Sequence, residues 1–138
     1  MEIDNSSKTF FENIFDGDNF QPSASIEKSF MQSFEGAINI EWVEYEEHLE
    51  AIFYKDKVEH IALFSKDGIL QEYRKSLPEG YLPYNVRKQM EAQGEIMNRV
   101  LINKGNTIQY EVIVRDANLD RHLFVMSDLG DLIKHKPL

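Results

Sequence analysis

The stretch Ala62–Leu70, read as ALFSKDGIL, sets the polar segment Ser65–Gly68 between two apolar runs. An Asp-Gly pair in this setting favours a β-hairpin, because glycine readily adopts the positive φ that such a turn requires. A second stretch of the same kind lies near the C-terminus at Phe124–Leu132, read as FVMSDLGDL. Its serine and its glycine each follow those of the first stretch by 62 residues. The correspondence predicts one structural unit that is built twice.

The first half is predicted to begin with a helix. Ser25 is a good N-cap residue, and Glu35-Gly36 is a typical helix end. Apolar residues recur at helical spacing between these two points and predict one apolar face. That face comprises Ile26, Phe30, Met31 and Phe34. Four strands are predicted to follow, at Ile38–Val43, Leu49–Tyr54, Glu59–Phe64 and Ile69–Lys75.

The second half shows the same order. Pro83 is predicted in the first turn of a second helix, where its missing N–H group costs nothing. Val86 and Met90 mark the apolar stripe of this helix, and Gly94 ends it. Four more strands are predicted at Glu95–Asn103, Thr107–Arg115, Arg121–Met126 and Asp131–His135.

Each half therefore reads as one helix followed by four antiparallel strands. We expect an α+β fold, a tandem repeat of two α-β4 units in an antiparallel sheet with both helices on one face. The predicted parts are a lead-in at residues 1–24, a first repeat at 25–77 and a second repeat at 78–138, all within one compact domain. A short docked helix is expected in the lead-in, around Phe10–Phe15.

Composition limits the class of protein. Hydrophobic residues make up 42% of the chain and charged residues 28%, which is typical of a globular protein rather than a disordered one. No apolar run approaches the ~20 residues that a membrane span requires. Cysteine is absent, which excludes disulfides and thiol catalysis.

The net charge of −9 is concentrated in residues 1–50, which hold 12 Asp or Glu against two Lys. So acidic a chain is a poor candidate for binding nucleic acid, since that binding depends on neutralising phosphates. The acidic half either aids solubility or steers a basic protein partner, and both interpretations stay open.

Six short segments together match the sequence pattern of a known family. In the first half they are Ile40-Glu41-Trp42, Glu50–Phe53 and Ala62–Gly68, and in the second half Leu82-Pro83, Tyr110-Glu111-Val112 and Phe124–Gly130. In this pattern the chain resembles the PepSY-like family with the beta-lactamase-inhibitor-like (BLIP-like) fold, over about Ser25–His135. The resemblance implies the tandem α-β4 architecture and, usually, an exported bacterial protein without known enzymatic activity. Relatives of this fold inhibit enzymes by binding them, which is an analogy of fold.

Members of that family generally carry a signal peptide, whereas this sequence begins at Met1 with an acidic lead-in. We therefore expect a cytoplasmic protein if Met1 is the native start, and a periplasmic or exported one if a signal peptide has been removed.

The histidines and acidic turns do not predict a metal site. None of His48, His60, His122 and His135 has His-x-His or His-Glu-x-x-His spacing. A zinc site would require His60 or His122, or His48 beside Glu46 or Glu47, to converge with carboxylates. Asp16 and Asp18 have the spacing of the first ligands of a calcium loop, but Gln21 stands where that loop requires glycine. We expect neither a metal nor a cofactor.

Catalytic residues are not predicted either. Ser65 and Ser127 lie in turns, where hydroxyls bond the nearby backbone, and neither lies in a Gly-x-Ser-x-Gly elbow. The sequence contains no glycine-rich phosphate loop. The chain is therefore expected to be non-enzymatic.

The best candidate for a functional surface is the open face of the sheet. Trp42 is predicted to face the core together with Ile38 and Ile40, so the alternate residues should face away from the helices. These tentative binding residues are Glu41, Glu50, Ile52 and Tyr54 in the first half, and Gln109, Glu111, Ile113 and Arg115 in the second. Apolar side chains within a charged rim are typical of a protein-binding surface.

The sequence thus predicts a protein- or peptide-binding module, inhibitor-like in its mode, that uses this face. One alternative is a small-ligand sensor with an aromatic-lined pocket between the helices and the sheet. A second alternative is a weak hydrolase that depends on His60 or His122. We expect a monomer, or a weak dimer that forms through sheet edges.

Overall fold

The structure, a computed structural model, describes residues 20–138. The short helix predicted around Phe10–Phe15 lies outside these described residues, as do Asp16 and Asp18. The elements follow in the order α2 (Ala24–Ser33), β1 (Ile38–Glu44), β2 (His48–Lys55), β3 (Val58–Ser65), β4 (Leu70–Ser76), α3 (Tyr84–Gln93), β5 (Glu95–Asn103), β6 (Ile108–Arg115), β7 (Arg121–Ser127) and β8 (Leu132–Pro137).

The described residues form an α+β fold, as the sequence predicts. Within them two helices accompany an eight-stranded sheet, in which the strands are ordered from β1 to β8. The pairs β1–β2, β2–β3, β5–β6, β6–β7 and β7–β8 are antiparallel. Every predicted strand is present, with ends that differ from the prediction by at most two residues.

The chain divides into two compact units. Unit 1 ends at Tyr73, and unit 2 runs from Arg74 to Leu138, so that the division falls within β4. Each unit has its own helix and its own cluster of buried side chains.

The helix of unit 1 begins two residues earlier than predicted. Ser23, not Ser25, is the N-cap of α2, and its side-chain oxygen accepts a hydrogen bond from the backbone N–H of Ile26 at 3.3 Å. Ser23 has the extended backbone that a cap residue needs, with φ −61° and ψ 157°, whereas Ser25 is already helical. The helix ends at its C-cap, Phe34, whose N–H bonds the carbonyl of Phe30.

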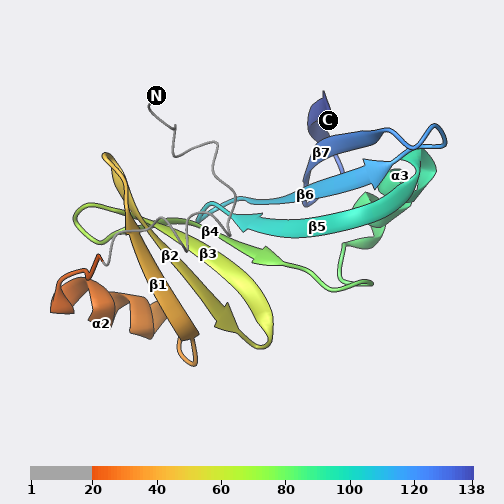
Figure 1. The fold of residues 1–138 in the computed structure, drawn as a ribbon. Coiled ribbons are helices and arrows are strands. Elements are labelled where there is room, and N and C mark those ends of the chain that lie inside the picture. The colour runs from red at the N-terminus through yellow and green to blue at the C-terminus, as the bar shows by residue number, and fades with distance from the viewer. Residues whose placement is uncertain (1–19) are drawn as a thin grey trace. The chain divides into compact units, whose positions relative to one another are not determined.

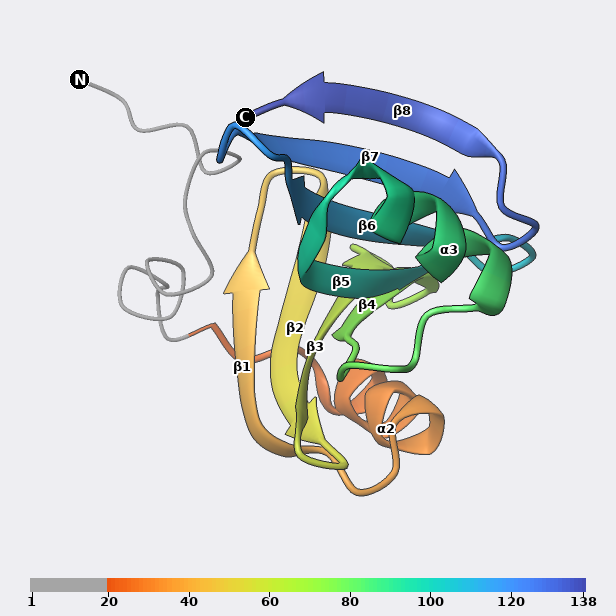
Figure 2. The same ribbon diagram turned by 90° about the vertical axis from the view of Figure 1, so that its right-hand side faces the viewer.

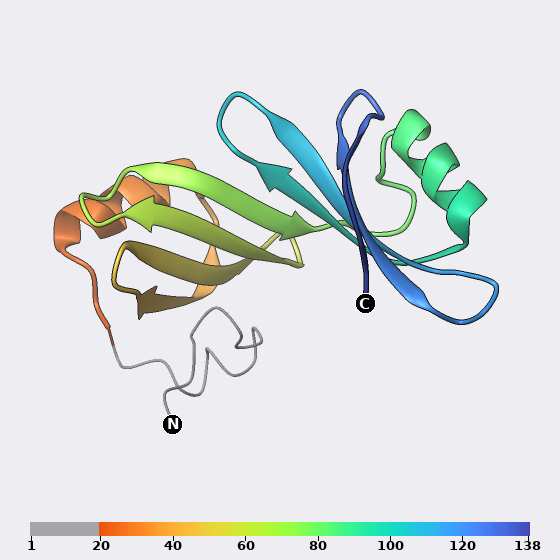
Figure 3. The same cartoon turned by 90° about the horizontal axis from the view of Figure 1, so that it is seen from above.

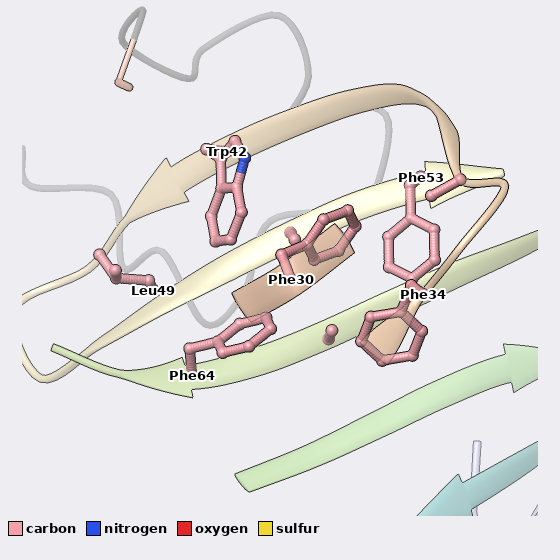
Figure 4. Close-up of a cluster of buried hydrophobic side chains, with 9 residues drawn as sticks. Phe30, Phe34, Trp42, Leu49, Phe53 and Phe64 are labelled. Carbon is pink, nitrogen blue, oxygen red and sulfur yellow. The ribbon is translucent and has the colours of Figure 1, made fainter. Parts of the chain in front are cut away.

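In unit 1, α2 lies against the strands (Figure 1), and a cluster of buried side chains, most of them aromatic, holds the two together. Phe30 lies at the centre of this cluster, as Figure 4 shows, and its side chain is only 1% exposed. Its ring centroid is 5.4 Å from that of Trp42 and 4.9 Å from that of Phe53, in edge-to-face arrangements in both cases. The prediction that Trp42 belongs to the core is confirmed, because its indole is buried in this cluster.

The prediction that Ile38 shares this core is wrong. Ile38 is 60% exposed, while Ile40 is half-buried and packs against the cluster. The cause is an irregularity in the β1–β2 pairing between Ile38 and Glu41, where Asn39 adopts a positive φ of 53°. A bulge of this kind reverses the alternation of side chains, so Ile38 no longer points the same way as Trp42.

The helix of unit 2 is α3. Pro83 is its N-cap rather than a residue of its first turn, and no side chain caps this end. Gly94 ends the helix, as predicted, and its φ of 155° favours glycine. A Cβ atom on Gly94 would lie 2.3 Å from the backbone oxygen of Arg115. The end of α3 therefore lies against the end of β6, and only glycine permits this approach.

The core of unit 2 is mainly aliphatic, whereas that of unit 1 is mainly aromatic. Figure 3 shows α3 to one side of the strands β5 to β7, and the buried side chains lie between them. Its fully buried members are Val86, Met90, Val112, Val114 and Met126, with Leu77, Leu82, Tyr110 and Phe124 around them. β8 pairs with β7 at the end of the strand order and is exposed along its whole length (Figure 2).

The two turns at Ser65–Gly68 and Ser127–Gly130 are built alike. In the first, the N–H of Ser65 donates to the carbonyl of Ile69 at 2.8 Å, and the side chain of Ser65 accepts from the N–H of Ile69 at 3.1 Å. In the second, Ser127 and Asp131 make the same two bonds at 2.8 and 2.9 Å. Both serines therefore serve as turn residues, as predicted. Within residues 20–138 no helix is long and apolar enough to cross a membrane.

Candidate functional site

The sheet of unit 1 has one face toward α2 and one face away from it. On β2 the side chains of Leu49, Ala51 and Phe53 belong to the core cluster. Because successive side chains of a strand alternate, Glu50, Ile52 and Tyr54 point to the other face. Glu41 pairs directly with Ile52 in the β1–β2 register and so joins them. All four candidate residues of unit 1 therefore share the face opposite α2.

Ile52 is far less exposed than expected for an anchor on an open face. Its side chain is 2% exposed, although it does not belong to the aromatic cluster. Glu41 and Ile61 are its partners on the two neighbouring strands. A polar substitution of Ile52 would destabilise the fold, and Tyr54 is the better residue with which to test this face.

Tyr54 is exposed, and its hydroxyl is held in place. It donates a hydrogen bond to Oε1 of Glu59 at 2.9 Å, across the β2–β3 register. This hydrogen bond, together with the negative charge of Glu59, raises the pKa of Tyr54 above its ordinary value of 10.0. The ring is therefore fixed as a neutral phenol beside a carboxylate, with an apolar surface and a polar tip.

The candidate residues of unit 2 lie on the single strand β6. Tyr110, Val112 and Val114 face the core beneath α3. By alternation, the candidates point to the opposite face. These four residues are Gln109, Glu111, Ile113 and Arg115, all of them half-buried.

Two of these four side chains make ion pairs within unit 2. Glu111 accepts from the guanidinium of Arg74 at 3.4 Å, and Arg115 donates to the carboxylate of Glu95 at 2.8 Å. Both pairs are partly exposed, so their effect on stability is small, but they fix where the charges lie. Ile113 lies between Glu111 and Arg115 along β6 and is the apolar residue of this face of the strand.

The face continues from β6 onto its neighbouring strands, whose residues the sequence analysis did not name as candidates. Ile113 pairs with Leu123, and Glu111 pairs with Val125 on one side and Val100 on the other. These aliphatic residues are half-buried. A basic rim flanks them on the side of β7 and β8 and consists of Arg121, Lys134 and Lys136, all exposed. The alternation of β7 and β8 was the signal that could have found them.

A second constellation in unit 2 joins the turn after β6 to the edge strand β8. The Nε2 atom of His122 lies 2.8 Å from Oδ2 of Asp116, and its Nδ1 atom lies 2.9 Å from Nε2 of His135. The other oxygen of Asp116 accepts backbone N–H groups from Asn118 and Asp120. The hydrogen bond from His122 is the main cause that holds the pKa of Asp116 below its ordinary value of 3.8.

The ring of His135 is also positioned by packing. It stacks on Phe124, with ring centroids 4.5 Å apart and planes inclined by 5°. The three polar side chains Asp116, His122 and His135 therefore form one chain of hydrogen bonds, which we call the Asp-His-His chain. Sequence spacing did not reveal it, because its members belong to three different segments that only the sheet register brings together.

His60 differs from His122 in its surroundings, although the two occupy similar places in β3 and β7. His60 is buried and stacks on Phe53 at 5.1 Å between ring centroids, and its Nε2 lies 3.2 Å from the carbonyl of Lys55. It is part of the core of unit 1. In the described part of the chain, no group of three or more His, Asp or Glu side chains is arranged to hold a metal ion.

A pocket of about 520 Å³ lies in unit 2 beside α3. Its lining is mostly charged, and consists of Glu79, Gly80, Leu82, Arg87, Glu91, Gly94, Glu95, Ile96 and Arg99. It contains no aromatic residue, so it differs from the aromatic-lined pocket that the small-ligand alternative predicts. The aromatic rings of unit 1 pack against one another instead.

No protein-family model matches the chain, and no curated protein matches it in sequence. Solved structures do match its fold. A BLIP-like protein from Bacteroides fragilis superposes with a TM-score of 0.74 at 17% identity, over 86% of this chain and 88% of the other. A DUF2874 family protein from Bacteroides uniformis gives a TM-score of 0.75 at 14% identity, over 85% and 90% of the two chains.

A third structure comes from Bacteroides eggerthii and is described only as a candidate periplasmic protein. It gives a TM-score of 0.76 at 13% identity, over 86% of this chain and 90% of the other. At these identities the likeness concerns the fold alone, and nothing in it supports the PepSY-like name. What the likeness establishes agrees with the fold predicted from the sequence: the chain has the BLIP-like fold.

Proposed function

We propose that this protein is a non-enzymatic module that binds a protein or a peptide through the open face of its sheet. One observation carries the proposal: Tyr54 and Ile113 present apolar surface on faces that point away from α2 and α3, and each stands among fixed charges. Apolar or aromatic anchors framed by charged groups are typical of protein-binding surfaces.

The charges on the two faces differ in sign, which bears on the partner. In unit 1 the anchor Tyr54 is hydrogen-bonded to the carboxylate of Glu59, and Glu41 and Glu50 lie further along the same face. Such a surface favours a partner with basic groups, in line with the acidity of residues 1–50. The basic rim of unit 2 would take acidic groups of a partner. A partner that engaged both faces would therefore carry separate basic and acidic patches.

The absence of catalysis is part of the proposal. In the Asp-His-His chain both ring nitrogens of His122 are engaged, one by Asp116 and one by His135. No ring nitrogen of His122 is therefore left to take a proton from a nucleophile. A weak hydrolase would have to break one of these bonds first, and hydrolysis that is lost on substitution of His60 or His122 would revive that alternative.

A small-ligand sensor is the second candidate, favoured by the size of the pocket beside α3. Its volume of about 520 Å³ falls within the range of small-molecule sites. The lining holds three Glu and two Arg, and Arg87 is paired with Glu91 at 3.6 Å, so a ligand that carries both an acidic group for Arg99 and a basic group for the carboxylates would suit it. Thermal-shift screening of small carboxylates tests this candidate: a compound that stabilises the wild type but not Arg99→Gln would support it, and the lack of any such compound would count against it.

Three further expectations belong with this proposal. The two successions of one helix and four strands are inferred to be an internal repeat, which the identical hydrogen bonds of the Ser65 and Ser127 turns support. A periplasmic location is favoured by the structural likeness to the Bacteroides eggerthii protein. Weak dimers would form through β1 or β8, the strands at the ends of the strand order.

The binding face is tested with peptides selected from a displayed library against the immobilised full chain. The affinity of the best peptide is then measured for the wild type, Tyr54→Ser and Ile113→Ser. We expect a loss of tenfold or more for at least one of them, because a truncated anchor removes on the order of 1.4 kcal/mol or more of binding energy.

The control is Tyr84→Ser, which removes a tyrosine from α3 that is more exposed than Tyr54, at 63% against 36%, and that lies outside the proposed binding face. It should leave the affinity unchanged. A selected peptide whose affinity depends on Tyr84 but on neither Tyr54 nor Ile113 would contradict the proposal.

A further inference from the structure

We propose that the outer edge of β1 is a strand-addition site, at which an extended basic peptide pairs antiparallel with residues 41–44 as a further strand of the sheet. This site consists of backbone groups along one edge, whereas the binding face described above consists of side chains such as Tyr54 and Ile113. The inference therefore goes beyond the proposed function, and its test depends on neither of those two residues.

The backbone of β1 presents hydrogen-bonding groups on its outer side. β1 is at one end of the strand order, so within the described part of the chain its only neighbouring strand is β2. The turn between them closes with a hydrogen bond of 2.9 Å from the N–H of Tyr45 to a carbonyl of β2, which fixes the alternation of the ladder. Glu41 and Val43 therefore direct their N–H and C=O groups toward β2. Those of Trp42 and Glu44 point outward, where another strand can bond them.

The two edges of the sheet differ in their protection. β8, at the other end of the strand order, carries Lys134, Lys136 and Pro137, and its pairing with β7 is irregular. Lysine, proline and bulges are the features with which edge strands avoid pairing with another chain. β1 contains neither lysine nor proline, and the irregularity of its pairing lies before the segment 41–44. The edge of β1 is therefore better suited to accept a strand than the edge of β8.

The charges along β1 select a basic occupant. Residues 29–54 contain six glutamates and neither lysine nor arginine. Glu41 is exposed, pairs with the apolar Ile52, and makes no ion pair with another residue that the structure describes. Glu46 and Glu47, in the turn after β1, are exposed as well. A basic side chain opposite Glu41 would form an opposite-charge pair across the strands, whereas a second copy of the chain would bring an equally acidic edge.

The alternation of β1 also indicates which side chains the added strand should carry. With a hydrogen-bonded pair at Trp42, the residues opposite Glu41 and Val43 lie in non-hydrogen-bonded pairs, in which side chains approach most closely. Glu41 and Val43 are two positions apart and alternate with the buried Trp42, so both point away from α2. The added strand should therefore carry a basic and an apolar residue two positions apart.

The test titrates the full chain with the capped peptide Arg-Val-Thr-Lys-Thr. In antiparallel pairing it places lysine opposite Glu41, valine opposite Val43 and its first threonine opposite Trp42. The fluorescence of Trp42, the single tryptophan, reports binding, and low ionic strength limits the screening of the exposed charges. We expect Glu41→Lys to weaken binding by about 3- to 30-fold, because like charges then face each other. Glu79→Lys makes the same change at an exposed carboxylate of unit 2 and should leave the affinity unchanged.

Two comparisons distinguish strand addition from simple attraction between charges, and both use the wild-type protein. Methylation of the peptide nitrogen opposite Trp42 keeps the charge of the peptide but removes a hydrogen-bond donor, and should weaken binding by tenfold or more. Binding of the unmethylated peptide should also slow the hydrogen exchange of the N–H groups of Trp42 and Glu44. The N–H of His135, which points outward from β8, should exchange as fast as before.

Three outcomes would overturn the proposal. One is the absence of binding at about millimolar peptide. Another is equal affinity for the methylated peptide, or for a peptide with glutamate in place of its arginine and lysine. The third is slow exchange of Trp42 and Glu44 without peptide, which would mean that a second copy or another segment already covers this edge. None of these outcomes would affect the binding face tested with Tyr54→Ser and Ile113→Ser.

Discussion

The side-chain amide of Gln89 donates a hydrogen bond to the carbonyl oxygen of Gly130 at 2.6 Å, so the turn after β7 is tied to α3. The equivalent turn of unit 1 lies against its own helix in another way. There Gly68 faces the side chain of Ile26 on α2, an apolar contact in place of a hydrogen bond. In each unit the turn thus contacts the helix that packs on the strands.

Alanine in place of Gly68 should destabilise the protein by about 2–3 kcal/mol. Gly68 has a φ of 89°, and a Cβ atom there would lie 2.7 Å from Cγ1 of Ile26. Gly105→Ala is the control, since Gly105 has a φ of 93° and open space around it, and should cost about 1 kcal/mol. Urea unfolding measures both. Equal losses would show that the turn does not press on α2.

Removal of the Phe30 ring should cost about 3–5 kcal/mol in Phe30→Ala. The ring is central to the aromatic cluster, and its loss leaves a cavity lined by Phe53, Trp42 and Phe64. Met31 provides the control on the same helix. Because Met31 is 43% exposed, Met31→Ala should change the free energy of unfolding by less than about 0.5 kcal/mol. Comparable losses in the two variants would contradict the placement of the core.

The contrast between Phe30 and Met31 shows which core residues helix periodicity can predict and which it cannot. A spacing of four residues identifies Phe30 and Phe34 as core residues, and the structure agrees. It does not decide whether the neighbouring Met31 completes the stripe. The same limit applies to strands: alternation correctly assigns Trp42 to the core, but the bulge at Asn39 turns Ile38 outward. Bulges and caps depend on single φ and ψ values, which residue patterns do not specify.

The candidate face could be predicted only in part. Alternation along β2 and β6 correctly predicts which residues share a face, because this depends only on the alternating directions of side chains within one strand. It does not give the exposure of Ile52, whose side chain is only 2% exposed although it points away from α2. The Asp-His-His chain was missed because residues distant in sequence meet only through the register of β7 and β8.

Replacement of Glu59 by Gln should lower the pKa of Tyr54 toward 10.0. The hydrogen bond to the Glu59 carboxylate and its negative charge both favour the protonated phenol. Because the pKa is raised in the folded state, this contact stabilises the fold below pH 10.0 and is lost as the pH rises through the folded value. A ¹³C NMR titration of the Tyr54 ring reports the pKa. Glu44→Gln, whose carboxylate instead pairs with Lys66, should leave it unchanged.

Replacement of His122 by Ala should raise the pKa of Asp116 back toward 3.8. The hydrogen bond from His122 is the largest cause of the lowered value, and the N–H groups of Asp120 and Asn118 add to it. Because the pKa is lowered in the folded state, the charged carboxylate stabilises the fold above pH 3.8, and this contribution is lost as the pH falls through the folded value.

The difference in stability between the wild type and Asp116→Asn should therefore shrink as the pH falls below 3.8. Urea unfolding across acidic pH measures the difference, and a ¹³C titration of the Asp116 carboxyl measures the pKa directly. His48→Ala serves as the control and should leave the pKa of Asp116 unchanged. His48 pairs with Glu50 and is not a member of the Asp-His-His chain. An Asp116 pKa that stayed low in His122→Ala would mean that the backbone N–H groups alone hold the carboxylate charged, and that His122 is not its main partner.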